Sequence, residues 1–160
     1  MLRPGRRLAI DVGKVRVGLA VSDQHGILAT PHATLERMSL SDDFDVLFST
    51  VQDLEDYLEI YVGLPINLQG NSTDSTRDAC LFAESLAHET SVPILLIDER
   101  LTTAISNQQI KQIGKSQKEA RSTIDQMAAV AILEYAFQVE QNSGKRPGVT
   151  LGDWIEQNAG

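Results

Sequence analysis

Apolar and polar residues alternate along the first thirty positions in the way that β-strands require. Residues 8–10 are apolar and lead into Asp11, and residues 15–21 alternate at the two-residue strand period. A third run begins at residues 27–29, and Pro31 is expected to interrupt it. Because only short turns separate these runs, the pattern predicts three antiparallel strands.

Helical and strand patterns alternate in the middle of the chain. Within residues 36–59, apolar side chains recur three and four positions apart, which predicts one amphipathic helix whose carboxylates face water. The apolar positions of this helix are Phe44, Leu47, Phe48, Val51, Leu54 and Leu58. Residues 60–64 and 94–97 are continuous apolar runs typical of buried parallel strands, and residues 79–86 predict a helix between them.

Two further helices are predicted after the last of these strands. A helix over residues 103–113 is expected to stop at Gly114. Ser116 and Glu119 then form a capping box for a long helix that reaches about Gln141.

The remaining tail, residues 144–160, is mainly polar, and only Trp154 and Ile155 could dock it. We therefore expect a loosely held extension there. The rest of the pattern predicts one α/β domain over residues 1–143. Its mixed five-stranded sheet has three antiparallel strands followed by parallel ones and is flanked by helices.

Composition narrows the classes of function. The chain has 160 residues and a single cysteine, Cys80, which excludes a disulfide framework and a zinc finger. No apolar run approaches the roughly 18 residues of a membrane span, so we expect a cytoplasmic protein with no membrane partner. The net charge of -8 argues against a uniformly basic nucleic-acid-binding surface. Basic residues still gather at Lys111, Lys115, Lys118 and Arg121, either as a basic rim or as a solvated surface.

Three acidic residues occupy positions next to apolar segments, where an unpaired carboxylate would be costly to bury. Asp11 directly follows an apolar strand, and Glu99 follows the strand over residues 94–97, at the end where open α/β sheets place their ligands. Asp125 lies on the small apolar face of the long helix. Converging carboxylates would bind Mg²⁺ or Mn²⁺ and support phosphodiester hydrolysis. The pattern equally allows Asp11 to cap a turn, Glu99 to pair with an arginine and Asp125 to bond a loop.

Four polar residues near these acids have two interpretations each. Lys14 and Arg16 contact phosphate or are exposed hairpin charges. Arg100 clamps a phosphate or orients the Glu99 carboxylate. Asn67 approaches the substrate strand or belongs to a loop that caps the following helix.

Four ordered segments resemble the motifs of a known family. Residues 11–23 read DVGKVRVGLAVSD, residues 62–67 read VGLPIN with Gly70 following, and residues 98–103 read DERLTT. The fourth segment holds Asp125, Ala128 and Ala129. Together these segments resemble the YqgF (RuvX) family, whose members are described as Holliday junction resolvases and as pre-16S rRNA nucleases.

The resemblance implies an RNase H-like fold and a metal-dependent nuclease with Asp11, Glu99 and Asp125 at the family's acidic positions. It implies maturation of the 5′ end of pre-16S rRNA in ribosome biogenesis, with structured RNA or branched DNA as substrate and a monomer or weak homodimer as the acting form. Junction resolvases of the broader fold usually carry a second acid near Asp125, where this chain has Ala128 and Ala129. This departure leaves three ligands and puts junction resolution in doubt.

Other functions start from the same residues. A non-catalytic nucleic-acid-binding or ribosome-associated module would also suit the acidic composition. Actin-like ATPases and sugar kinases use a related Asp-x-Gly hairpin, but they need two domains, and 160 residues provide one. A receiver-like phosphoacceptor at Asp11 is disfavoured, because the first strands form a hairpin and not a βα unit.

Overall fold

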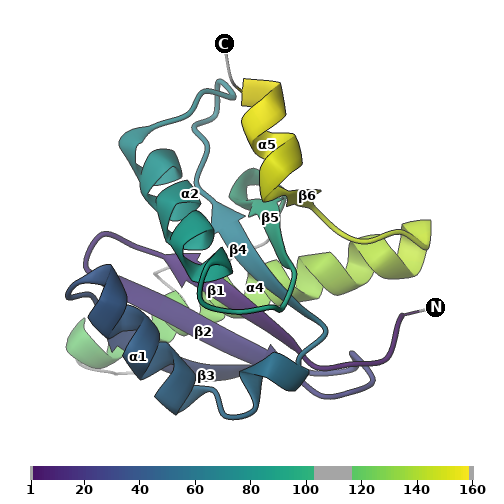
Figure 1. Cartoon of the computed structure of the whole chain (residues 1–160), viewed down its shortest axis with the longest axis horizontal. Helices are drawn as coiled ribbons and strands as arrows, with labels where there is room; N and C mark the ends of the chain where they lie inside the picture. Colours follow the sequence, from purple (N-terminus) through teal and green to yellow (C-terminus); the bar gives the residue numbers. More distant parts are fainter. Residues whose placement is uncertain (1, 103–116, 159–160) are drawn as a thin grey trace.

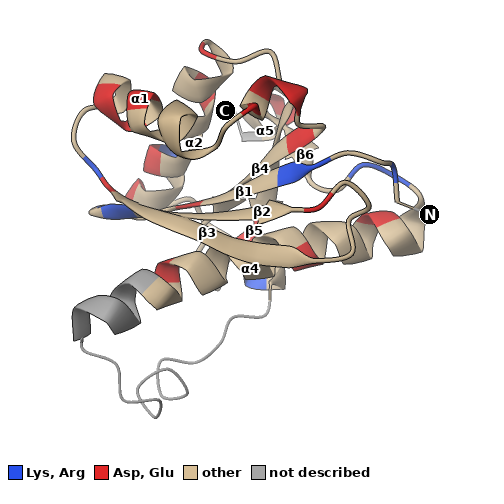
Figure 2. Ribbon diagram, turned by 90° about the horizontal axis from the view of Figure 1, so that it is seen from below, with Lys and Arg blue, Asp and Glu red and all other residues tan. Residues whose placement is uncertain are grey.

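The computed structural model describes residues 2–102 and 117–158, which form a mixed β-sheet between two helical layers. Helices α1, α2 and α5 cover one face of the sheet, and the long helix α4 crosses the other face (Figures 1 and 2). The strands are β1 (Arg7–Val12), β2 (Arg16–Ser22), β3 (Ala29–Glu36), β4 (Glu59–Leu64), β5 (Ile94–Asp98) and β6 (Val149–Thr150). The helices are α1 (Leu40–Thr50), α2 (Asp74–Ala87), α4 (Gln117–Ser143) and α5 (Leu151–Asn158), with short 3-10 turns η1 (Leu54–Asp56) and η2 (Glu99–Leu101).

The sheet has the order β3-β2-β1-β4-β5-β6. β1, β2 and β3 pair antiparallel, and β1, β4 and β5 pair parallel, which confirms the predicted mixed sheet. The sheet has six strands and not five, because β6 adds antiparallel to β5. Pro31 was expected to interrupt the third strand, but it lies inside β3. There the register slips by one residue opposite Leu19 and Ala20, and an edge strand tolerates the missing N–H of proline.

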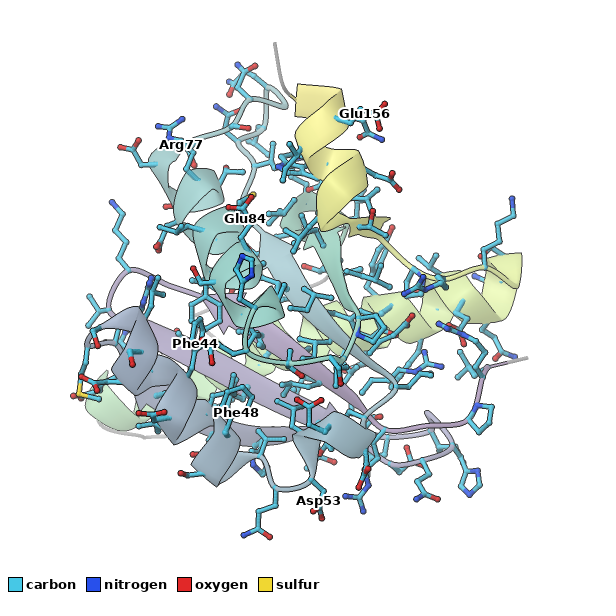
Figure 3. The ribbon with its side chains drawn as sticks, in the orientation of Figure 1. Phe44, Phe48, Asp53, Arg77, Glu84 and Glu156 are labelled. Carbon is cyan, nitrogen blue, oxygen red and sulfur yellow. The ribbon has the colours of Figure 1, made fainter. Side chains whose placement is uncertain are left out.

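Two hydrophobic clusters hold the layers together, one on each face of the sheet. Leu8, Ile10 and Val62 face α1 and α2, where Phe44 of α1 meets Phe82 of α2 edge-on with ring centroids 5.1 Å apart. Figure 3 shows Phe44 and Phe48 on the side of α1 that faces the sheet, as expected for core residues.

Small residues line the other face of the sheet and let α4 lie close. Ala9 and Ala20 of the sheet pack against Ala129 and Ala136 of α4. A Cβ atom added at Gly18 of β2 would lie only 2.1 Å from a backbone oxygen of α4. The absence of side chains at this point therefore sets the distance between helix and sheet.

The acidic segment differs from its prediction. Its helix α1 ends at Thr50, and Asp53 has a left-handed backbone with φ of 59° before the turn η1. Val51 is buried in an extended conformation, which turns the chain back toward β4 and leaves Leu58 outside any helix. The prediction that the carboxylates face water is wrong for Asp43, which is buried and accepts a hydrogen bond from the backbone N–H of Met38 at 2.7 Å.

The C-terminal part contains more structure than its polarity suggests. The predicted long helix is confirmed as α4, whereas the helix predicted over residues 103–113, Gly114 and the capping residue Ser116 lie outside the described residues. The expectation of a loosely held tail is wrong for residues 144–158. Here β6 pairs with β5, and Leu151 and Trp154 pack against the core. Within the described ranges, no helix is long and apolar enough to cross a membrane.

A buried cluster of charges fixes the ends of these segments together. Arg7 is fully buried and donates to Glu140 of α4 at 2.8 Å, while Arg3 bonds both Glu140 and Glu59. Arg146, before β6, donates to Glu59 at 2.7 Å. Burial raises the pKa of Glu140, but the hydrogen bonds from Arg3 and Arg7 outweigh it and hold that pKa at about 2. This cluster lies at the start of β1 and β4, the opposite end of these strands from the candidate site.

Candidate active site

The parallel strands bring two of the predicted acids together. Asp11 is near the end of β1, and Glu99 begins the turn η2 directly after β5. Strand β4 lies between β1 and β5 and has a glycine, Gly63, at this level. A Cβ atom at Gly63 would come within 2.5 Å of the Glu99 carboxylate. The missing side chain therefore lets Glu99 reach across β4 to Asp11, with which it forms a hydrogen bond.

The two carboxyl groups are electrostatically coupled. Burial raises the pKa of Asp11, and the charge of Asp125 raises it further, against the hydrogen bond to Glu99. Burial also raises the pKa of Glu99 to about 9, with additional contributions from the hydrogen bond and charge of Asp11. Two carboxylates in contact cannot both ionise without a counter-charge. Burial and proximity therefore disfavour ionisation of both groups at once.

The third acid, Asp125, approaches from the opposite layer. It lies on α4 at the point where the helix crosses Gly18, the residue that pairs with Asp11 in the β1–β2 ladder. Its carboxylate is close enough to influence the pKa of Asp11. Asp125 Oδ2 accepts a hydrogen bond from Arg16 Nε at 2.8 Å. The structure thus brings Asp125 near Asp11 and pairs it with Arg16.

The charges of the site fit a divalent cation. Across residues 2–102 and 117–158, no three acidic, histidine or cysteine side chains meet closely enough in this conformation to hold a metal ion. Protonation of the Asp11–Glu99 pair, which burial favours, and the guanidinium of Arg16 instead offset the charges of the three carboxylates. A cation with oxygen ligands could replace both. The donor set of Asp11, Glu99 and Asp125 therefore suits a divalent cation that prefers oxygen ligands.

The predicted phosphate-binding residues differ in what they contact. Lys14 is exposed in the β1–β2 turn. Arg100 does not orient Glu99, because its guanidinium is bidentate on Asp98, with Nη2 to Oδ2 at 2.7 Å and Nε to Oδ1 at 3.1 Å. This fork stays at the rim of the site, 3.4 Å from the position of a Cβ atom at Gly70.

Asn67 builds the loop between β4 and α2. Its side-chain oxygen accepts hydrogen bonds from the backbone N–H groups of Gln69 at 3.1 Å and Asn71 at 2.8 Å. Thr73 then caps α2 in a reciprocal capping box with Thr76. These contacts match the interpretation of the segment as a helix-capping loop, and Asn67 is thereby used to shape it.

The basic residues predicted late in the chain are only partly located. Lys111 and Lys115 lie outside the described residues. Lys118 and Arg121 lie in the first turns of α4, on the helix that carries Asp125.

Two residues of the site were missed by sequence reasoning. Arg37 donates to the carbonyl oxygen of Gly13 at 3.0 Å and to Asp78 Oδ2 at 2.5 Å, and so ties the turn after Asp11 to helix α2. Its signal in the sequence is that it is the single basic residue in the acidic segment of residues 36–59. Gly63 belongs to the segment VGLPIN, but its role depends on the three-dimensional arrangement, because it lies opposite Glu99 only in the folded sheet.

A mixed sheet with this strand order, carrying carboxylates at the ends of its central strands and on the helix behind them, defines an RNase H-like protein. Solved structures agree with this class: Thermus thermophilus RuvC in complex with a Holliday junction substrate is similar, with a TM-score of 0.54. That comparison covers 89% of this chain and 99% of that one at 14% identity, so it shows the fold alone. The chain belongs to the RuvX family, described as "Holliday junction resolvase", whose model matches residues 5–139.

Curated relatives from actinobacteria extend the match over nearly the whole chain. A protein from Leifsonia xyli named "Putative pre-16S rRNA nuclease" is 44% identical over 147 residues, which is 92% of this chain and 94% of that protein. A protein of the same name from Clavibacter michiganensis is 43% identical, covering 94% of this chain and 93% of that protein. The resemblance inferred from the four motifs is therefore confirmed.

Proposed function

We propose that this protein is a cytoplasmic, metal-dependent nuclease that hydrolyses phosphodiester bonds at the 5′ end of pre-16S rRNA during ribosome biogenesis. The observation that carries the proposal is the contact between Asp11 and Glu99 across Gly63. Holding two acidic side chains together raises the free energy of their ionised forms. Carboxyl groups with pKa values perturbed in this way are typical of functional sites. The names of the relatives support RNA as the substrate.

Each acid has a distinct task in this proposal. Asp11, Glu99 and Asp125 hold Mg²⁺ or Mn²⁺, and a bound cation supplies activation of water and stabilisation of the leaving oxygen. Asp11 and Glu99 would then be held in their ionised forms, because a bound cation would supply the counter-charge that they lack.

The basic residues bind the backbone of the nucleic acid. Arg16 leaves Asp125 and turns to a phosphate, and Lys14 contacts a neighbouring phosphate from the same turn. Arg100 and the late basic residues Lys115, Lys118 and Arg121 extend this contact, whereas Asn67 fixes the adjoining loop. Their charges offset the repulsion between RNA and an acidic protein. The protein acts as a monomer or weak homodimer.

Branched DNA is the second candidate substrate, because the family description and the structural neighbour both refer to the Holliday junction. A resolvase would cut paired strands as a two-fold dimer, whereas trimming one RNA strand needs a single site. The two candidates therefore differ in substrate and in acting form.

The experiment compares cleavage of a labelled pre-16S 5′ leader fragment, an unrelated single-stranded RNA and a four-way DNA junction in Mg²⁺, in Mn²⁺ and in EDTA. Asp11→Asn is the test variant, and Asp45→Asn, an exposed aspartate on α1, is the matched control. We expect metal-dependent cleavage of the leader fragment that Asp11→Asn abolishes and Asp45→Asn preserves. Preferential junction cleavage would favour the second candidate. Binding without cleavage of any substrate would favour a non-catalytic module.

A further inference from the structure

A pocket of about 470 Å³ opens beside the candidate active site. It lies past the carboxyl ends of β4 and β5, between the loop that follows β4, the turn η2 and the C-terminal segment. Leu64 and Leu96 contribute apolar surface, and Trp154 of α5 adds an aromatic wall. Asp98, Arg100 and Gln157 add polar groups. The lining is thus partly apolar and partly polar, and a concave site with convergent polar groups can bind a small ligand group.

The last strand, β6, is short, so the end of β5 beyond Leu96 lines the pocket instead of pairing with it. β6 pairs only with Leu95 and Leu96 of β5 among the described residues. Gly148, just before β6, has a φ of 74° and approaches the carbonyl of Leu96 so closely that a Cβ atom would lie 2.4 Å from it. The chain then turns into α5, which continues from β6 (Figure 1), and Trp154 of this helix packs against the core. The segment expected to be a loose tail therefore supplies one wall.

The position of Trp154 is fixed from the other side. It forms a hydrogen bond with Cys80 of α2 and packs against the core. Held in this way, the indole loses little freedom when another ring stacks on it.

The polar side of the pocket is formed by the two neighbours of Glu99 in the chain. Asp98 and Arg100 line the pocket and directly flank Glu99 in the chain. The Arg100 side chain is 36% exposed, so its guanidinium is accessible at the rim. A strand whose scissile phosphate lies at Asp11 and Glu99 would therefore pass Arg100 and bring an adjoining nucleotide to the pocket.

We propose that this pocket binds an unpaired nucleobase of the substrate strand. The base stacks on Trp154, Asp98 and Gln157 provide acceptor and donor groups for its edge, and Arg100 contacts the neighbouring phosphate. A base in a duplex cannot enter, so the pocket favours a single-stranded segment next to the cleaved bond. This inference rests on the proposed nuclease function, because it assigns the base to the strand that is cut.

The test uses the fact that Trp154 is the only tryptophan of the chain. The intrinsic fluorescence of the full-length protein is titrated with a single-stranded RNA hexamer and with a fully paired RNA duplex, in EDTA so that no cleavage occurs. Anisotropy of labelled RNA measures binding independently. We expect saturable quenching by the hexamer at concentrations that match the anisotropy, and little quenching by the duplex.

Two variants separate stacking from folding. Trp154→Leu should weaken hexamer binding by about 5- to 150-fold, the range expected for loss of one stacked base, with duplex binding unchanged. Ile155→Ala, the exposed neighbour on α5 that does not line this pocket, is the matched control and should bind as the wild type. If thermal melting shows that Trp154→Leu is unfolded, Gln157→Ala takes its place, with the same direction expected.

Three results would overturn the proposal: hexamer binding that leaves the fluorescence unchanged, equal affinity in Trp154→Leu and Ile155→Ala, or no hexamer binding by anisotropy. The nuclease proposal is judged separately by metal-dependent cleavage and its loss in Asp11→Asn. Cleavage without quenching would therefore reject the base pocket and leave the nuclease function standing.

Discussion

The contact between Gly18 and α4 predicts that Gly18→Ala damages both stability and activity. The added Cβ atom would lie 2.1 Å from the backbone oxygen of Asp125 and 2.5 Å from its carbonyl carbon. These are backbone atoms of a helix, so they cannot rotate away. Restoring an ordinary separation of 3.4 Å requires α4 to move outward by about 1.3 Å, the difference between the two distances.

The magnitude follows from the size of this overlap. Overpacking a well-filled interior costs about 1–3 kcal/mol, and we expect the upper end because backbone must yield. For a domain of this size, 3 kcal/mol lowers the melting temperature by about 6–12 °C. The same movement carries the Asp125 carboxylate away from Asp11, and a misplacement of about 1 Å at a reacting centre lowers the rate by about 100-fold.

Thermal melting by circular dichroism and single-turnover cleavage of the leader fragment measure the two effects. Gly152→Ala is the matched control, since a Cβ atom at this glycine of α5 would meet nothing within 4 Å. It should retain activity and gain up to about 1 kcal/mol, because alanine favours the helix. If Gly18→Ala melted and cleaved like the wild type, the close packing of α4 on β2 would be refuted.

Three further outcomes are expected. In EDTA, the free energy of unfolding of the wild type, measured by urea titration, should fall relative to that of Glu99→Gln as the pH rises from about 5 to 9. The reason is that the raised pKa of Glu99 makes its ionisation costly to the folded state. A difference that does not change with pH would contradict the raised pKa of Glu99. Glu140→Gln should lower the free energy of unfolding by about 3 kcal/mol at pH 7. The difference from wild type should shrink as the pH falls from about 4.5 to 2, since the depressed pKa of Glu140 stabilises the fold only above that window. A difference that stays constant in the same urea titrations would rule this out. Gly63→Ala should displace the Glu99 carboxylate and reduce cleavage at least tenfold with a smaller change in melting temperature; unchanged cleavage would show that Glu99 does not need to cross β4.

The early strands and the long helix could be predicted because their patterns are local. Alternation in residues 15–21 follows from a sheet with different surroundings on its two faces, and the two-residue period needs no knowledge of the rest of the fold. The tail could not be predicted in this way. β6 has two residues, and Trp154 packs only because β5 offers an open edge and α2 a neighbouring surface.

The sequence identified the acidic residues of the site, but it could not show that Asp11 and Glu99 are in contact. Asp11 and Glu99 each follow an apolar strand, which marks them as carboxylates that need a partner. Their meeting depends on β4 lying between β1 and β5 with a glycine at the crossing point, which is a property of the sheet order. The same holds for Arg16, which pairs with Asp125 over 109 positions of sequence.

The role of the three carboxylates is measured by single-turnover cleavage of the pre-16S leader fragment across a Mg²⁺ titration. The proteins compared are wild type, Asp11→Asn, Glu99→Gln and Asp125→Asn. All four proteins are checked by melting beforehand, so that a loss of activity reports on the site. We expect wild-type cleavage to require Mg²⁺ and each substitution to lower its rate at least 100-fold in a folded protein. Wild-type cleavage that persists in EDTA, or folded variants that cut at the wild-type rate, would contradict the assignment of these three carboxylates to a metal-dependent nuclease site.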